Sequence, residues 1–170
     1  MKSKEQKKKE LAELKDKLSK SKITIITSFA REGEKGLSVS EIGVFKKDLR
    51  TVNAEYLVEK KTLFDKALTQ SPIIDQQSAI NVFEYPGSLG AVFGYGDEQL
   101  AAKAVYNFAK KHSALKYFGA IQAGKFMEFA EFTEFAKLPS KEVMIARLLG
   151  MMKYPLSALA MVLDQISKKK

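Results

Sequence analysis

The densest apolar pattern in the chain lies in residues 138–170 and predicts one long helix. Pro139 blocks an upstream helix, and Ser140 can accept hydrogen bonds from the first free amides. The apolar residues form two adjacent stripes, whereas a helix that buries one face in its own domain shows an apolar arc of about 100°. A second surface is therefore expected to cover this helix. The stripes consist of Met144, Leu148, Met151, Leu159, Val162 and Ile166, and of Ile145, Leu149, Met152, Leu156 and Leu163.

Three interpretations of the double stripe compete. A membrane span needs about 20 consecutive apolar residues, but the longest uncharged run in this segment is Tyr154 to Leu163, and Arg147, Lys153 and Asp164 would lie at or near the hydrocarbon. An ordinary core helix is the second interpretation. The third, which we favour, is a helix covered by helices of partner proteins, because methionine fills irregular gaps on shared surfaces.

Pro155 predicts a kink in this helix. Proline removes one backbone hydrogen bond and its ring collides with the preceding turn, which places the kink near residues 150–153. The two resulting half-segments, roughly 140–153 and 155–167, are each long enough for one partner to bind.

Upstream of this segment the pattern alternates between strand and helix. A nearly continuous β-branched run is typical of a buried strand, and the strand–helix–strand–helix order that follows is typical of a layered α/β unit. A helix from Gln6 precedes these elements, with Leu11, Leu14 and Leu18 facing inward. The predicted elements are a strand at Lys22–Phe29, a helix capped by Ser38 or Ser40 and reaching Arg50, a strand at Glu55–Lys60 and a helix at Lys61–Gln70.

The same alternation continues after Pro72. The prediction is an α/β fold: a layered α-β-α domain with a mixed sheet over residues 1–137, followed by a protruding C-terminal helix, residues 138–170, kinked near Pro155. The later elements are short apolar runs at Ala79–Phe83 and Leu89–Phe93 around a turn at Tyr85-Pro86-Gly87, a helix from Asp97 to Lys111, strands at Ala114–Ile121 and Lys125–Glu128, and a helix at Phe129–Lys137 whose phenylalanines are expected in the core.

Composition narrows the class of protein. At 170 residues the chain is one domain, or one domain with an appendage. Its net charge of +9 favours a polyanion as partner. The chain has no cysteine, which excludes a disulfide framework and cysteine-based zinc sites. No apolar stretch of signal-peptide length follows the basic start, so we expect no signal peptide and a cytoplasmic location.

Basic residues cluster in three places. Lys46, Lys47 and Arg50 share one face of a predicted helix, Lys60 and Lys61 precede another helix whose free amides also attract phosphate, and Lys7-Lys8-Lys9 lies in a lysine-rich helix. Scattered solubilising lysines would produce a similar composition. If the clusters form one surface, they would bind structured RNA, because no stacking platform for single strands accompanies them. About six neutralised phosphates would produce a log–log salt slope of roughly −4 to −5.

Catalytic chemistry is not indicated. The single histidine, His112, follows two lysines at a helix end, and neither a thiol nucleophile nor a histidine-rich metal site can be assembled. Gly87, Gly90, Gly94 and Gly96 lack the Gly-Lys-Ser/Thr ending of a phosphate loop and are best explained as turn glycines beside a strand. We therefore expect no enzyme, no cofactor and no metal.

A series of short motifs extends along nearly all of residues 1–166. In chain order they are Gly36-Leu37-Ser38-Val39, Phe45 to Arg50 (FKKDLR), Ala54 to Val58 (AEYLV), Lys60 to Leu63 (KKTL), Pro86-Gly87 before Ala91-Val92-Phe93, Gly119, Gly124-Lys125, Leu138 to Glu142 (LPSKE), Ala146 to Leu149 (ARLL), Pro155-Leu156 and Val162-Leu163. Their order and spacing resemble the bacterial large-subunit ribosomal protein L-ten family, which forms the base of the ribosomal stalk.

The resemblance implies two functions. Residues 1–137 would be a globular domain that docks on large-subunit rRNA at the GTPase-associated centre, beside protein L-eleven. Residues 138–170 would be a helix that carries dimers of the acidic stalk protein L-seven/L-twelve, which recruit translational GTPases. By helix length we expect two dimers. The family's RNA-contacting segments correspond to Lys46, Lys47, Arg50, Lys60, Lys61 and the lysine-rich start, and the expected partner-binding residues are Met144, Ile145, Leu148, Leu149, Met152, Leu156, Leu159, Leu163 and Ile166.

One alternative of a different class remains open at this stage. A basic cytosolic protein could pack its amphipathic C-terminal helix on an anionic membrane or on a copy of itself, because lysines together with an apolar helix permit both. The ribosomal interpretation expects no membrane partner.

Overall fold

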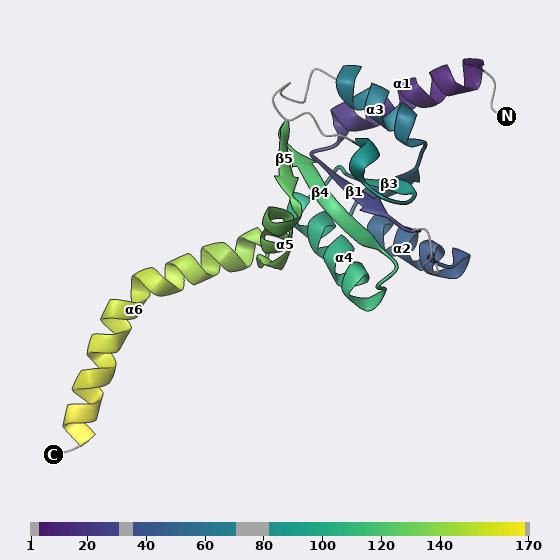
Figure 1. Cartoon of the computed structure of the whole chain (residues 1–170). Helices are drawn as coiled ribbons and strands as arrows, with labels where there is room; N and C mark the ends of the chain where they lie inside the picture. The colour runs from purple at the N-terminus through teal and green to yellow at the C-terminus, as the bar shows by residue number, and fades with distance from the viewer. Residues whose placement is uncertain (1–3, 31–35, 71–81, 169–170) are drawn as a thin grey trace. The chain divides into compact units, whose positions relative to one another are not determined.

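The computed structural model describes residues 4–30, 36–70 and 82–168. The chain divides into two compact units, residues 1–137 and residues 138–170, and Figure 1 shows their elements. The first unit contains α1 (Lys4–Lys20), β1 (Ile23–Ser28), α2 (Val39–Thr51), β2 (Ala54–Val58), α3 (Lys61–Gln70), η1 (Val82–Glu84), β3 (Leu89–Gly94), α4 (Glu98–Lys111), β4 (Lys116–Gln122), β5 (Lys125–Glu128) and α5 (Phe129–Lys137), and the second contains α6 (Lys141–Lys168).

The strands form one five-stranded sheet in the order β2-β3-β1-β4-β5. Its central strand, β1, is buried along its whole length, which agrees with its continuous β-branched sequence. Ile25 of β1 is aligned with Val92 of β3 on one side and with Ala120 of β4 on the other.

All four strand pairings in this sheet are antiparallel. The α/β class is confirmed, but the expectation of a mixed sheet is wrong. The strand–helix–strand order from β1 to β2 does make these two strands run in the same direction, since each is antiparallel to β3. They are not neighbours, because β3 lies between them, and no parallel pairing results.

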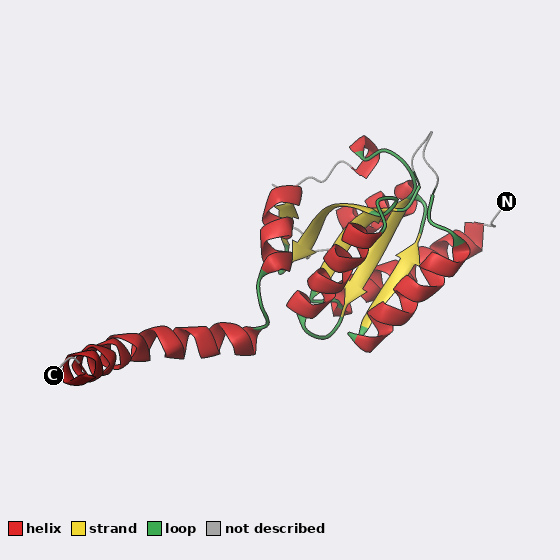
Figure 2. Ribbon diagram, turned by 90° about the horizontal axis from the view of Figure 1, so that it is seen from below, coloured by secondary structure: helices red, strands yellow, loops and turns green. Residues whose placement is uncertain are grey.

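Helices cover both faces of the sheet, which confirms the layered α-β-α prediction (Figure 2). Because side chains alternate along a strand, β1 directs Ile23 and Ile25 into one apolar cluster and Ile26 into another. The first cluster includes residues of α2, α4 and α5, and the second includes residues of α1 and α3. Lys17 of α1 also pairs with Glu55 of β2 at 2.8 Å, which fixes α1 over the sheet.

The apolar run Ala79–Phe83 adds no strand within the described residues. Val82–Glu84 forms a 3₁₀ helix instead, and residues 79–81 lie outside the described part of the chain. Val82 is nevertheless fully buried in the second cluster. An apolar run of this length can serve as a strand or as a buried helical turn, and periodicity alone does not separate the two.

Gly90 of β3 is required by close packing against Tyr56 of β2. A Cβ at position 90 would collide with the Tyr56 hydroxyl and ring, and that ring is held in the core, where burial raises its pKa to about 12. We expect Gly90→Ala to lower the free energy of unfolding by about 1–3 kcal/mol, the usual cost of overpacking.

Urea denaturation would measure this effect, and Gly43→Ala is the matched control. Nothing lies within 4 Å of a Cβ at position 43 in α2, so this second variant should be more stable by about 0.5–1 kcal/mol. A Gly90→Ala protein as stable as the wild type would mean that Tyr56 moves aside at no cost.

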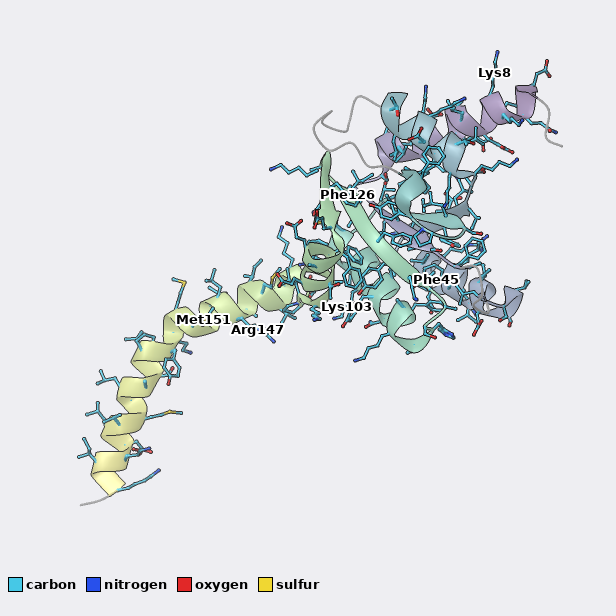
Figure 3. All side chains as sticks on the ribbon, viewed as in Figure 1. Lys8, Phe45, Lys103, Phe126, Arg147 and Met151 are labelled. Carbon is cyan, nitrogen blue, oxygen red and sulfur yellow. The ribbon has the colours of Figure 1, made fainter. Side chains whose placement is uncertain are left out.

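The second unit is one helix, α6, which contains Pro155. Taken by itself, it has no buried residue, and by length and composition alone it would also qualify as a membrane-crossing helix. Figure 3 shows a bend beside Met151. Pro155 cannot donate a hydrogen bond to the carbonyl of that residue, four positions earlier, and the predicted kink is confirmed.

Candidate functional site

The cationic face of α2 is positioned by a capping box and two buried side chains. The Ser38 hydroxyl accepts a hydrogen bond from the Glu41 amide, and a Glu41 carboxylate oxygen accepts one from the Ser38 amide at 2.8 Å. Phe45 and Leu49 are buried against the sheet. This orientation leaves Lys46, Lys47 and Arg50 exposed, and no ion pair within the described residues engages them.

Loss of this cap has a predictable, pH-dependent cost. Hydrogen bonds from Ser38 lower the pKa of Glu41, and the adjacent His112 adds to the effect. A lowered carboxylate pKa contributes stability above the unfolded value of 4.5 that is lost as the pH falls through the folded value. We expect Ser38→Ala to cost about 1 kcal/mol at pH 7 and less at pH 3, as measured by urea denaturation at both pH values.

Ser88→Ala is the control for this variant, since Ser88 is exposed and donates its backbone amide to the Ala30 carbonyl. It should change stability by less than about 0.5 kcal/mol at either pH. An effect of Ser38→Ala that is equal at pH 7 and pH 3 would show that the Glu41 carboxylate takes no part in the cap.

Lys60 and Lys61 lie at the start of α3 and differ in their surroundings. Lys60 is exposed, whereas Lys61 is half-buried and donates from its ammonium group to the Tyr85 carbonyl at 2.6 Å. Both line an open pocket of about 330 Å³ at the end of β2, together with Phe29 and Gly87. Gly87 has a φ of +88° and packs directly against the Ala30 carbonyl, which fixes the turn on one side of this pocket.

The third basic group, Lys7, Lys8 and Lys9, is exposed on α1, and Figure 3 labels Lys8. Leu14 and Leu18 of the same helix are buried in the cluster that also contains α3. The N-terminal lysines therefore belong to the same helical layer as Lys60 and Lys61, whereas the α2 cations belong to the layer on the opposite face of the sheet.

The expected partner-binding side chains of α6 are accessible when this helix is taken by itself. Met144 is partly exposed, and the other eight are exposed. Their exposed fractions run from 48% at Ile145 to 72% at Leu156, so the two stripes predicted from the sequence are intact on the helix surface.

Sequence reasoning missed one group, an aromatic cluster between α4, β4 and α5. The rings of Tyr117 and Phe129 stack with their centroids 5.0 Å apart. Of the α5 phenylalanines expected in the core, Phe132 is buried and Phe135 is partly buried, but Phe129 is 56% exposed. No local motif predicts this cluster, because its members come from separate elements. The available sequence signal was the run Lys116-Tyr117-Phe118, because successive side chains of a strand point to opposite faces of the sheet.

The residues considered for catalysis, His112 and the glycines of β3, make packing contacts that stabilise the fold. The His112 ring stacks on Phe108, and its Nδ1 lies 3.1 Å from a Glu41 carboxylate oxygen. A Cβ at Gly94 would meet Ile23, so this glycine serves strand packing. Over residues 4–30, 36–70 and 82–168, no three histidine or acidic side chains gather as a metal site would require.

The exposed cations of the layered domain and the exposed apolar stripes of α6 are surface features of a protein that binds other macromolecules. The particular family follows from comparison with known proteins. The family model described as Ribosomal protein L10 matches residues 2–110, and the one described as Ribosomal protein uL10 C-terminal region matches residues 138–170. The chain belongs to this ribosomal protein family, a cytoplasmic component of bacterial ribosomes, as the motif order had indicated.

Similar bacterial proteins extend over almost the whole chain. A protein of Caldanaerobacter subterraneus named Large ribosomal subunit protein uL10 is 38% identical over 95% of this chain and 86% of its own length. Proteins of the same name from Fusobacterium nucleatum and Clostridioides difficile are 36% and 32% identical, over 96% and 94% of this chain and 94% and 89% of their own lengths.

Proposed function

We propose that the protein forms the base of the ribosomal stalk. Residues 1–137 bind large-subunit rRNA at the GTPase-associated centre, beside protein L-eleven. Residues 138–170 carry dimers of the acidic stalk protein L-seven/L-twelve, which recruit translational GTPases. The observation that carries this proposal is the double apolar stripe of α6, with no buried residue on the helix itself.

The charge of α6 supports an acidic partner. Its four basic residues, Lys141, Arg147, Lys153 and Lys168, outnumber its two acidic ones, Glu142 and Asp164. Opposite charges at the rim of an apolar interface speed association and select the partner. A membrane surface would also attract these cations, but the three charges at Arg147, Lys153 and Asp164 oppose deep insertion of the helix.

The length and the bend of α6 support two dimers. Its 28 residues span about 42 Å at 1.5 Å per residue, and the bend beside Met151 divides the helix into a shorter segment, Lys141–Gly150, and a longer one, Met152–Lys168. Each segment presents both stripes and is long enough to enter the groove of one helical partner.

The cation positions support an RNA surface at the β2 edge of the sheet. β2 is an edge strand, and α2 and α3, which precede and follow it in the chain, lie on opposite faces. An RNA that contacts Lys46, Lys47 and Arg50 as well as Lys60 therefore crosses this edge. Contacts of this kind bind phosphates and respond to RNA shape, and they carry no base-specific information.

Native mass spectrometry of the chain co-expressed with the acidic stalk protein tests the proposal directly. We expect four acidic chains, as two dimers, on one copy of this protein, and co-purification of the complex with large ribosomal subunits. Flotation of the chain with anionic liposomes, in the absence of any bound acidic chain, would favour the membrane alternative and contradict the stalk proposal.

A further inference from the structure

The aromatic cluster between α4, β4 and α5 surrounds a pocket that the stalk function does not use. The pocket has a volume of about 530 Å³ and opens to solvent. β5 pairs with β4 only from Gly119 onward, so the first residues of β4 lie beyond that pairing and contribute to the wall. The lining comprises Tyr106, Ala109, Lys110, Ser113, Leu115, Lys116, Tyr117, Phe118 and Phe129.

The stacked pair in this pocket is held in place before any ligand binds. Tyr117 and Phe129 are nearly parallel, with 14° between their ring planes. The Tyr117 hydroxyl lies 3.2 Å from the Thr133 hydroxyl, which in turn donates to the Phe129 carbonyl at 2.7 Å. Because Phe129 is 56% exposed, the stack retains aromatic surface that a further flat ring can cover.

The charges at this pocket favour an anionic ligand with a flat ring. Lys110 and Lys116 are among the described residues that line it. Lys110 is exposed and is followed by the exposed Lys111 at the end of α4. A strand of RNA combines these two properties, because its bases stack on aromatic side chains while its phosphates bind adjacent lysines.

We propose that the pocket binds an unstacked nucleobase of a single-stranded RNA segment, with a flanking phosphate on Lys110. This proposal rests on the RNA-binding function proposed for residues 1–137 and adds a base-stacking site to it. It also revises the expectation of structured RNA alone, which assumed that no aromatic platform was present.

Fluorescence anisotropy of the full chain with labelled octauridylate tests the site. Stacking of one base is worth about 1–3 kcal/mol, so Phe129→Ala should weaken binding about 5- to 150-fold, and Phe129→Trp should retain it. Phe83→Ala is the matched control, since Phe83 is 59% exposed and lies in η1, outside the lining. An abasic ribose–phosphate octamer should bind wild type and Phe129→Ala equally.

A second variant separates this site from the rRNA surface. Lys110→Ala should reduce the log–log salt slope for octauridylate by about 0.7, the effect of one phosphate contact on a single strand. Octauridylate binding that Phe129→Ala leaves unchanged, or weakens no more than Phe83→Ala, would overturn the pocket proposal even if a large-subunit rRNA fragment still binds. Failure of the wild-type chain to bind that rRNA fragment would instead contradict the proposed function.

Discussion

Replacing Leu148 and Leu159 of α6 by aspartate is expected to abolish binding of acidic stalk-protein dimers and to leave RNA binding unchanged. The two positions are eleven residues apart, three helical turns, and therefore lie on the same face. Burying one leucine contributes about 1.5–3 kcal/mol. Loss of two such contacts lowers affinity by about 150- to 20,000-fold, and each aspartate adds the cost of bringing an unpaired charge into the interface.

The matched control adds the same charge to the narrow polar strip of the same helix, which consists of Arg147, Tyr154, Ser157 and Gln165. Ser157→Asp with Gln165→Asp introduces two carboxylates away from both stripes, and it should bind the dimers within a few fold of the wild type. Native mass spectrometry counts the dimers bound to each variant, and a gel shift with an rRNA fragment measures RNA affinity. If Leu148→Asp with Leu159→Asp reduced both activities equally, RNA and protein binding would not be separable along the chain.

Charge reversal on α2 should have the opposite selectivity. Two phosphate contacts release counterions when RNA binds, and this release makes binding about 30-fold tighter at 0.1 M salt than at 1 M salt. Lys46→Glu with Lys47→Glu removes these contacts and adds repulsion, so we expect rRNA affinity to fall by about 100-fold, with a log–log salt slope shallower by about 1.5. Both lysines are exposed, so the fold and dimer binding by α6 should be unaffected.

Lys103→Glu with Lys137→Glu is the control for charge reversal as such. Both residues are exposed, and they lie on α4 and α5, which pack on the same face of the sheet as α2; neither lysine is assigned to an RNA contact. This variant should weaken rRNA binding by no more than the general change in net charge, and it should not flatten the salt slope to the same extent. Equal effects of the two double variants would place the RNA surface elsewhere.

The elements of the domain could be predicted from sequence because each has a local cause. Asp97 accepts a hydrogen bond from the Gln99 amide and begins α4 as expected, and the β-branched residues of β1 form its buried strand. The position of β3 between β1 and β2 could not be predicted in the same way. Which strands become neighbours depends on packing across the whole domain. Strands that are consecutive in the chain are usually adjacent in the sheet, but not always.

The candidate sites also fall into two groups: those that follow from local sequence and those that depend on contacts between distant residues. The stripes of α6 follow from the 3.6-residue period alone, and the α2 cations are exposed because Phe45 and Leu49 direct the opposite face inward. The engagement of Lys61 with the Tyr85 carbonyl depends on a contact between residues 24 positions apart. The Tyr117–Phe129 stack likewise requires β4 and α5 to come together, and no local pattern encodes that approach.

The central place of β1 also determines when the domain can fold during synthesis. β1 (Ile23–Ser28) is made early, yet its partners are β3 (Leu89–Gly94) and β4 (Lys116–Gln122). The nascent chain must therefore keep an apolar strand unpaired while about 66 further residues are added to complete β3, a period in which such strands are prone to aggregate. These distant pairings raise the contact order and slow the folding of the sheet, whereas α6 needs only its own hydrogen bonds to form.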